Sequence, residues 1–149
     1  MAFAIQRTID APIEVVFDWL AEVTNYARVP GIFRAISTSP GAPDPRGVGL
    51  RREVSAAGVL FSEEITEFTP PSRIGYVVRR SKPSLPHRGG TIELRPEGDR
   101  TLVVWTIFFQ VSTPVIGKAA TALGAVALGA GFRLILATAA RECRRGVRS

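Results

Sequence analysis

The sequence predicts an α+β fold, in which a seven-stranded antiparallel sheet packs against one long C-terminal helix and two short helices follow the first strand. Seven segments show the alternation or the β-branched and aromatic enrichment of strands, and mostly short connections favour an antiparallel meander. The last third of the chain is rich in alanine and has no proline after Pro114, which is typical of a helix. Because 149 residues suit one domain with its own core, we expect residues 1–149 to form a single domain.

We expect the C-terminal helix to run from Pro114 to about Arg145. Thr113 offers an N-cap oxygen, and Pro114 suits the first helical position, where no N–H is needed. At about 1.5 Å per residue, such a helix is about 45 Å long and must lie across the main surface of a small domain. Since it is rich in alanine and glycine, we expect it to act as a lid that leaves a hollow beneath it.

The remaining elements follow in order along the chain. The first strand alternates apolar and polar residues, and the helix after it carries apolar residues at helical spacing. Residues 40–47, 81–90 and 96–99 and the pair Ala57–Gly58 predict loops and turns. The expected strands are Phe3–Asp10, Ile32–Ser39, Val48–Ala56, Val59–Phe68, Arg73–Arg80, Thr91–Arg95 and Thr101–Val111, and the expected short helices are Pro12–Val23 and Thr24–Arg28.

Alternate residues on three strands form rows that we expect to face the C-terminal helix. Large side chains in these rows lie opposite small helix residues, which predicts a cavity between sheet and helix. The alternatives are that each residue simply packs in the core, and that the alanine- and glycine-rich face lies close against the sheet. The predicted ligand-binding residues are Phe61, Glu63, Ile65, Ile74, Tyr76, Val78, Val103, Trp105, Ile107 and Phe109 on the strands and Leu123, Gly124, Ala127 and Gly131 on the helix.

Polar residues in these rows are the candidates for chemistry. Glu63 falls between Phe61 and Ile65, where a partly desolvated carboxylate orients a ligand hydroxyl or acts as an acid or base. A shifted strand register would instead turn Glu63 outward. The phenol of Tyr76 is the second candidate, with simple packing of its ring as the alternative. His87 is the only histidine and lies in an expected loop without a clear carboxylate partner, so we do not predict a catalytic role for it.

The order strand, two helices, six strands and long helix is the helix-grip arrangement. The segment APIEVVFDWLAEVTNY resembles the helix pair after the first strand in the START-like, Bet v 1-like (SRPBCC) superfamily. EEITEFTPPSRIGYVV followed by DRTLVVWTIFFQV resembles its polyketide cyclase/dehydrase and lipid-transport branch. This resemblance covers nearly the whole chain and implies a curved sheet wrapped around the C-terminal helix, enclosing an apolar cavity. It implies no single activity, because the scaffold hosts carriers, sensors and enzymes.

Composition argues against several classes of protein. The net charge of +6 is dispersed and lacks interleaved aromatic residues, so we expect no nucleic-acid binding. The uncharged run 119–132 is shorter than the about 20 residues of a membrane span, so we expect no transmembrane segment. One cysteine and the absence of a secretory signal predict a cytoplasmic protein without an internal disulfide. No phosphate loop, paired-histidine spacing or nucleophile elbow is present, so no cofactor or metal site is predicted.

The first functional hypothesis is binding or transport of a hydrophobic small molecule, such as a lipid, an isoprenoid or a polyketide-like compound, in the predicted cavity. One alternative is a cyclase or dehydratase that acts on a ligand there through Glu63 and Tyr76. The other is a membrane-surface or partner-binding role for the basic end of the chain, Arg141 to Arg148. The sequence makes no prediction about oligomeric state.

Overall fold

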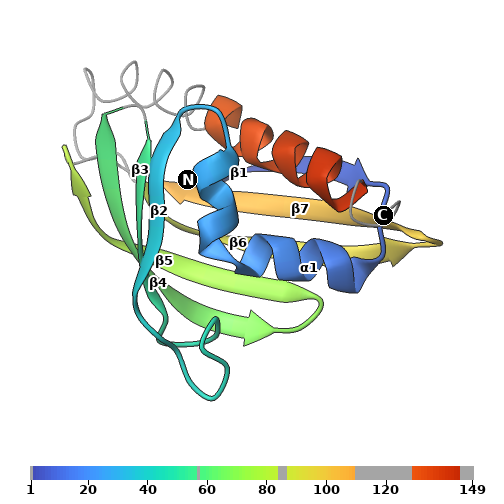
Figure 1. The fold of residues 1–149 in the computed structure, drawn as a ribbon, viewed down its shortest axis with the longest axis horizontal. Coiled ribbons are helices and arrows are strands. Elements are labelled where there is room, and N and C mark those ends of the chain that lie inside the picture. Colours follow the sequence, from blue (N-terminus) through green and yellow to red (C-terminus); the bar gives the residue numbers. More distant parts are fainter. Residues whose placement is uncertain (1, 57, 84–86, 110–128, 145–149) are drawn as a thin grey trace.

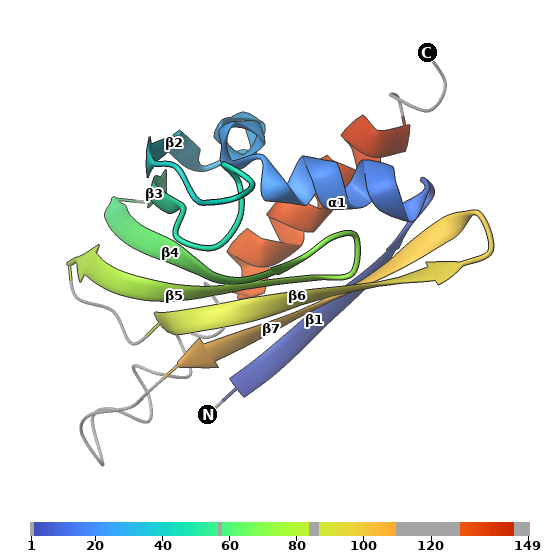
Figure 2. The ribbon, with the colours of Figure 1, turned by 90° about the horizontal axis from the view of Figure 1, so that it is seen from below.

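The computed structural model describes residues 2–56, 58–83, 87–109 and 129–144. A curved antiparallel sheet carries the helices on its concave face (Figure 1 and Figure 2). Residues 129–144 form the described part of the C-terminal helix. The predicted helix-grip fold class is therefore confirmed. The elements are β1 (Ala2–Ile9), α1 (Ile13–Ala21), the 3-10 helix η1 (Val23–Arg28), β2 (Ile32–Ser39), β3 (Arg51–Ala56), β4 (Val59–Thr69), β5 (Arg73–Lys82), β6 (His87–Glu97) and β7 (Arg100–Phe109).

The sheet order β1-β7-β6-β5-β4-β3-β2 places the first two strands at opposite edges. Strands β2 to β7 run as an antiparallel meander, and β1 pairs with β7. The chain crosses from the β1 edge to the β2 edge through α1 and η1, which lie over the concave face (Figure 2). Helix α1 contacts β6 and β7 and η1 contacts β2, so the crossing covers only part of the concave face.

Some boundaries differ from the prediction. Strand β3 begins at Arg51 rather than Val48, because a turn closed by the Leu50 N–H and the Gly47 carbonyl (3.0 Å) precedes it. The prediction of a loop over residues 81–90 is wrong at both ends, since β5 reaches Lys82 and β6 begins at His87. Pairing with β7 supplies partners for that glycine-rich segment, which its local composition does not reveal. The predicted helical residues 114–128 lie outside the described residues.

The core forms where α1 and the C-terminal helix pack on the sheet. Helix α1 buries Val16, Phe17 and Leu20, and the C-terminal helix buries Leu136 and Ala139 in the same cluster. Figure 1 shows these two helices side by side over the strands. None of the helices in the described residues is long and apolar enough to cross a membrane.

A glutamate near the end of the C-terminal helix joins it to the other two helices. The indole Nε1 of Trp19 donates a hydrogen bond to Glu142 Oε1 (2.9 Å), and Arg28 Nε lies 3.0 Å from the same carboxylate. The C-terminal helix is thus held to α1 and η1 by directed contacts as well as by apolar packing. These contacts fix the position of the helix that closes the cavity described next.

Candidate functional site

A cavity of about 460 Å³ lies between the concave face of the sheet and the C-terminal helix. Its volume falls within the range of small-molecule sites. Pro30 and Gly31 on one side and Leu134 on the other are exposed, so the cavity opens to the surface between the η1–β2 corner and the helix. Its lining is mostly apolar and is made by Tyr26, Val29, Pro30, Gly31, Ile32, Arg52, Val54, Ala56, Val59, Phe61, Glu63, Tyr76, His87, Trp105, Ala130, Gly131, Phe132, Leu134 and Ile135.

An ion pair between neighbouring strands is buried in the wall of this cavity. Arg52 on β3 is the register partner of Glu63 on β4, and Arg52 Nε donates to Glu63 Oε1 at 2.7 Å. The two side chains are 2% and 8% exposed. Burial alone lowers the pKa of the Arg52 guanidinium, but the Glu63 carboxylate and the phenols of Tyr26 and Tyr76 together outweigh burial and raise that pKa above its usual value. Arg52 therefore stays charged, and its charge is balanced inside the site.

Two tyrosine rings hold the Arg52 guanidinium between them. The guanidinium carbon lies 5.5 Å from the ring centroid of Tyr26 and 5.2 Å from that of Tyr76, which are cation–π distances. The Tyr26 hydroxyl donates to the Leu20 carbonyl at 2.6 Å, so its proton is already committed. Burial raises the pKa of both phenols, which keeps them protonated at neutral pH. Arg52 is therefore fixed in position by its neighbours on three sides.

A hydrogen-bonded cluster of Trp105, Tyr76 and His87 lies beside the ion pair. Trp105 Nε1 donates to Tyr76 Oη (3.2 Å), and His87 Nε2 lies 3.3 Å from the same oxygen and 3.2 Å from the Gly89 carbonyl. Burial lowers the pKa of the His87 imidazole, which favours its neutral form near pH 7. Its Nδ1 atom is buried without a hydrogen-bond partner among the described residues. Gly90 permits this arrangement, because a Cβ atom there would lie 2.9 Å from Tyr76 Oη.

The predicted ligand-binding residues divide into three groups. Those that line the cavity are Phe61, Glu63, Tyr76, Trp105 and Gly131. Those that lie outside the lining are Ile65, Ile74, Val103 and Ile107 in the hydrophobic core, Val78 packed against that core, and Phe109, whose ring lies 5.7 Å from that of Phe3. Leu123, Gly124 and Ala127 lie outside the described residues. Ile65, Ile74 and Val103 belong to the same buried cluster as Phe17 and Leu20 of α1, so they pack against core side chains and not against the cavity.

Sequence reasoning missed Arg52, Tyr26 and His87. The sequence did contain a signal for Arg52. A tight turn predicted between Ala56 and Val59 makes these two residues partners, and counting backward along β3 and forward along β4 makes Arg52 the partner of Glu63, as observed. No comparable signal existed for His87, since its position depends on long-range pairing with β7. No group of three or more histidine, cysteine, aspartate or glutamate side chains in the described residues could hold a metal ion.

Comparison with known proteins identifies the family and the fold of the chain. Residues 2–144 match the family described as polyketide cyclase / dehydrase and lipid transport. The chain belongs to this family. No curated relative matches the sequence.

Several solved structures share the fold at low sequence identity. The Zhui aromatase/cyclase from Streptomyces sp. R1128 has a TM-score of 0.78 at 18% identity, covering 100% of this chain and 96% of its own. The protein TTHA0849 from Thermus thermophilus has a TM-score of 0.77 at 19% identity, with coverages of 98% and 99%. A START superfamily protein from Mycobacterium smegmatis has a TM-score of 0.75 at 14% identity, with both coverages 97%. These likenesses establish the fold alone.

Proposed function

We propose that the protein binds a hydrophobic small molecule, such as a lipid, an isoprenoid or a polyketide-like compound, with its apolar body in the cavity and a polar group beside Arg52 and Glu63. The observation that carries the proposal is a cavity of about 460 Å³ whose apolar wall contains one buried ion pair. Family membership points the same way, because the family description names lipid transport and polyketide cyclase chemistry.

The physical basis of binding is removal of apolar ligand surface from water. That term contributes about 25 cal/mol per Å² before the costs of association. The ion pair gives the ligand an orientation, since Arg52 offers only donors and the ionised Glu63 only acceptors. Because the two charges balance, an uncharged ligand leaves no net charge buried. We therefore expect a neutral amphipathic compound, with a hydroxyl or carbonyl group, to bind better than a fatty acid or an amine of equal length.

Trp105 supplies a direct readout of binding. It lines the cavity, whereas Trp19 is not part of the lining and donates its indole N–H to Glu142. Titration with the isoprenoid alcohol farnesol is expected to change the tryptophan fluorescence saturably, and Trp105→Phe is expected to remove most of that change. Native mass spectrometry of the purified protein is expected to show a co-purifying apolar compound. A protein that carries no such compound and does not respond to farnesol, fatty alcohols or aromatic polyketones does not have the proposed function.

A proton-transfer enzyme is the second candidate, and the contact between Tyr76 and His87 favours it. A neutral imidazole within 3.3 Å of a phenol in an apolar cavity is suited to act as a base that removes a proton next to a ligand carbonyl. Glu63 is less free for this role than the sequence indicated, since it accepts from Arg52. Tyr76 would then donate to the carbonyl oxygen of the ligand.

Hydrogen–deuterium exchange at the α-carbon of a long-chain β-diketone tests the enzyme candidate. Exchange followed by NMR is expected to be faster with protein than with imidazole at equal concentration, and His87→Asn is expected to lower it by about a hundredfold. A rate no higher than that of free imidazole rules out the enzymatic candidate and leaves the binding function intact.

A further inference from the structure

The η1–β2 corner at the mouth of the cavity carries an unusually exposed aromatic residue. Phe33 is 80% exposed, the largest exposed fraction among the large apolar side chains of the described residues. It directly follows Gly31 and Ile32, which line the cavity. Leaving a phenylalanine side chain in water forfeits the free energy that its burial would contribute, so a phenylalanine exposed at this rim needs a physical explanation.

A β-bulge turns Phe33 outward. In the ladder between β2 and β3, Ile32 pairs with Ala56 and Arg34 pairs with Ser55, so Phe33 is the extra residue between them. A β-bulge changes the direction in which a side chain points. Because β2 is an edge strand, no further strand covers the Phe33 side chain. Phe33 therefore projects from the lip of the cavity instead of entering the core.

The opposite lip is also apolar. Leu134 on the C-terminal helix lines the cavity and is 44% exposed, and Ala130 and Gly131 beside it are exposed as well. This helix and the loop that enters β2 both contribute residues to the lining of the cavity. The two lips thus form an apolar rim, which we define as Ile32, Phe33, Ala130, Gly131 and Leu134.

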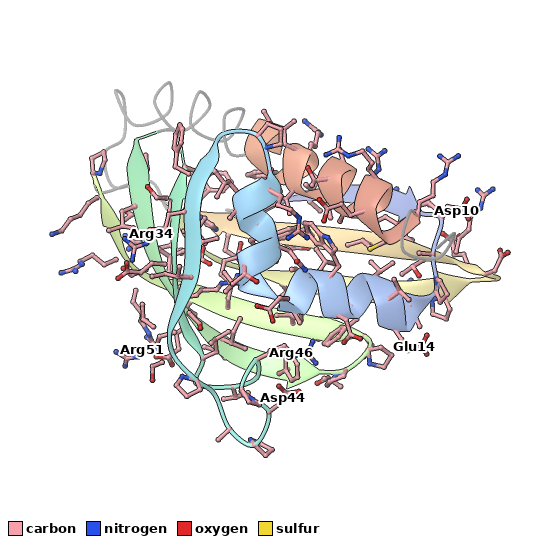
Figure 3. All side chains as sticks on the ribbon, in the orientation of Figure 1. Asp10, Glu14, Arg34, Asp44, Arg46 and Arg51 are labelled. Carbon is pink, nitrogen blue, oxygen red and sulfur yellow. The ribbon has the colours of Figure 1, made fainter. Side chains whose placement is uncertain are left out.

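The charges around this apolar rim are of one sign. The segments 29–34, 54–56, 58–61 and 129–135 contribute residues to the cavity lining, and residues 80–82 pair with β4 beside them. These segments contain arginine and lysine but no aspartate or glutamate. Their cations are Arg34, Arg80, Lys82 and Arg133, and none of these forms an ion pair with a described residue. Figure 3 shows Arg34 over β2 and β3, at the end of the molecule away from Asp10 and Glu14.

We propose that the apolar rim and its flanking cations dock on an anionic phospholipid bilayer, with Phe33 inserted among the lipid acyl chains and the cavity mouth facing the membrane. An apolar tip surrounded by basic side chains matches the two layers of such a surface, acyl chains below and phosphate groups above. This interaction goes beyond ligand binding, because it does not require an occupied cavity. It also differs from a role for the basic C-terminus, since Arg141 and Arg144 lie at the other end of the helix.

Vesicle co-sedimentation tests the proposal with the full chain. The wild-type protein is expected to sediment with phosphatidylcholine vesicles containing about 30% phosphatidylglycerol, and to remain unbound with phosphatidylcholine alone or at high salt. Phe33→Ser is expected to weaken binding to the anionic vesicles by about tenfold. The matched control is Phe108→Ser, because Phe108 is 42% exposed on the outer face of β7, away from the rim.

A second pair of variants separates the rim from the basic C-terminus. Arg34→Gln with Arg133→Gln is expected to weaken vesicle binding, whereas Arg141→Gln with Arg144→Gln is expected to leave it unchanged. Phe33→Trp provides a positive signal, since its emission is expected to shift to the blue when the anionic vesicles are added. Failure of the wild-type protein to bind them, equal losses in Phe33→Ser and Phe108→Ser, or a loss confined to the Arg141 and Arg144 variant overturns the proposal.

The same variants keep this proposal distinct from the proposed function. Phe33 does not line the cavity, so Phe33→Ser is expected to bind farnesol as the wild-type protein does, by the Trp105 signal. Normal farnesol binding without vesicle docking overturns the docking surface alone. Vesicle docking without farnesol binding overturns the ligand proposal alone.

Discussion

Arg52 and Glu63 form an ion pair, with 2.7 Å between Nε and Oε1, inside a cavity whose other walls are mostly apolar. Neighbouring strands of one hairpin present the two side chains to each other in direct register. Taking two charges out of water costs several kcal/mol per ion, so each of these buried charges is stable only with its oppositely charged partner beside it. This mutual dependence makes the pair suitable for orienting a ligand and makes each partner sensitive to loss of the other.

Replacing only Arg52 is therefore expected to destabilise the protein strongly. Arg52→Met leaves the Glu63 carboxylate buried and unpaired and is expected to lower the free energy of unfolding by about 3–5 kcal/mol. The double variant Arg52→Met with Glu63→Leu is expected to recover most of that loss, because no charge is then left alone. Urea denaturation measures both values. Additive losses in the double variant would show that the two charges do not depend on each other.

Gly131 gives a way to close the cavity without disturbing the fold. It lines the cavity, and a Cβ atom added to it meets no atom within 4 Å. Gly131→Phe is expected to fill the mouth and to reduce farnesol affinity by at least about tenfold, as measured by the Trp105 signal. Gly131→Ala is the matched control, expected to bind farnesol normally and to gain up to about 1 kcal/mol of stability from its higher helix propensity. Equal affinity in both variants would place the ligand elsewhere.

The hydrogen bonds to Glu142 predict an acid-dependent contact between helices. Bonds from Arg28 and Trp19 hold the pKa of the Glu142 carboxyl below its usual value. A lowered folded-state pKa means that the stabilisation is present above the unfolded value and is lost as pH falls through the folded one. In a Trp105→Phe background, Trp19 fluorescence is expected to titrate with a midpoint below about pH 4.3, the ordinary value for glutamate.

Glu142→Gln is the control for this titration, and it is expected to abolish the transition while keeping an acceptor for Trp19. A midpoint at or above the ordinary glutamate value contradicts the lowered pKa.

Cys143 reports how tightly the C-terminal helix is docked. The thiol is buried, with Sγ 3.9 Å from the Val15 carbonyl, and burial raises its pKa to about 12. Only the thiolate reacts with disulfide reagents, so the native protein at pH 8 is expected to react about a thousandfold more slowly than the urea-unfolded chain. Ellman's reagent measures both rates. A native rate within about tenfold of the unfolded rate would show that the helix opens readily.

The strand pattern could be predicted because alternation of side chains is a local property of an extended backbone. Val103, Trp105 and Ile107 are buried on β7 as their alternation indicates, and β2 has the predicted bounds Ile32–Ser39. For Glu63 the local pattern left two orientations open, and the ladder between β3 and β4 turns it inward. The loop predicted at His87 is a strand, since β7 supplies hydrogen-bond partners that no local signal reveals.

The sequence by itself determined the order of the elements, the rows of alternate apolar residues on the strands, and the fact that the C-terminal helix carries small side chains. Only the tertiary structure decided which of those rows meet a cavity and which meet α1, and it alone brought Tyr26, Arg52, Tyr76 and His87 together. The physical reason is the distance along the chain over which each feature is determined. Periodicity depends on the bond geometry of neighbouring residues, whereas a site made by several separate elements depends on register, bulges and helix docking across the whole chain.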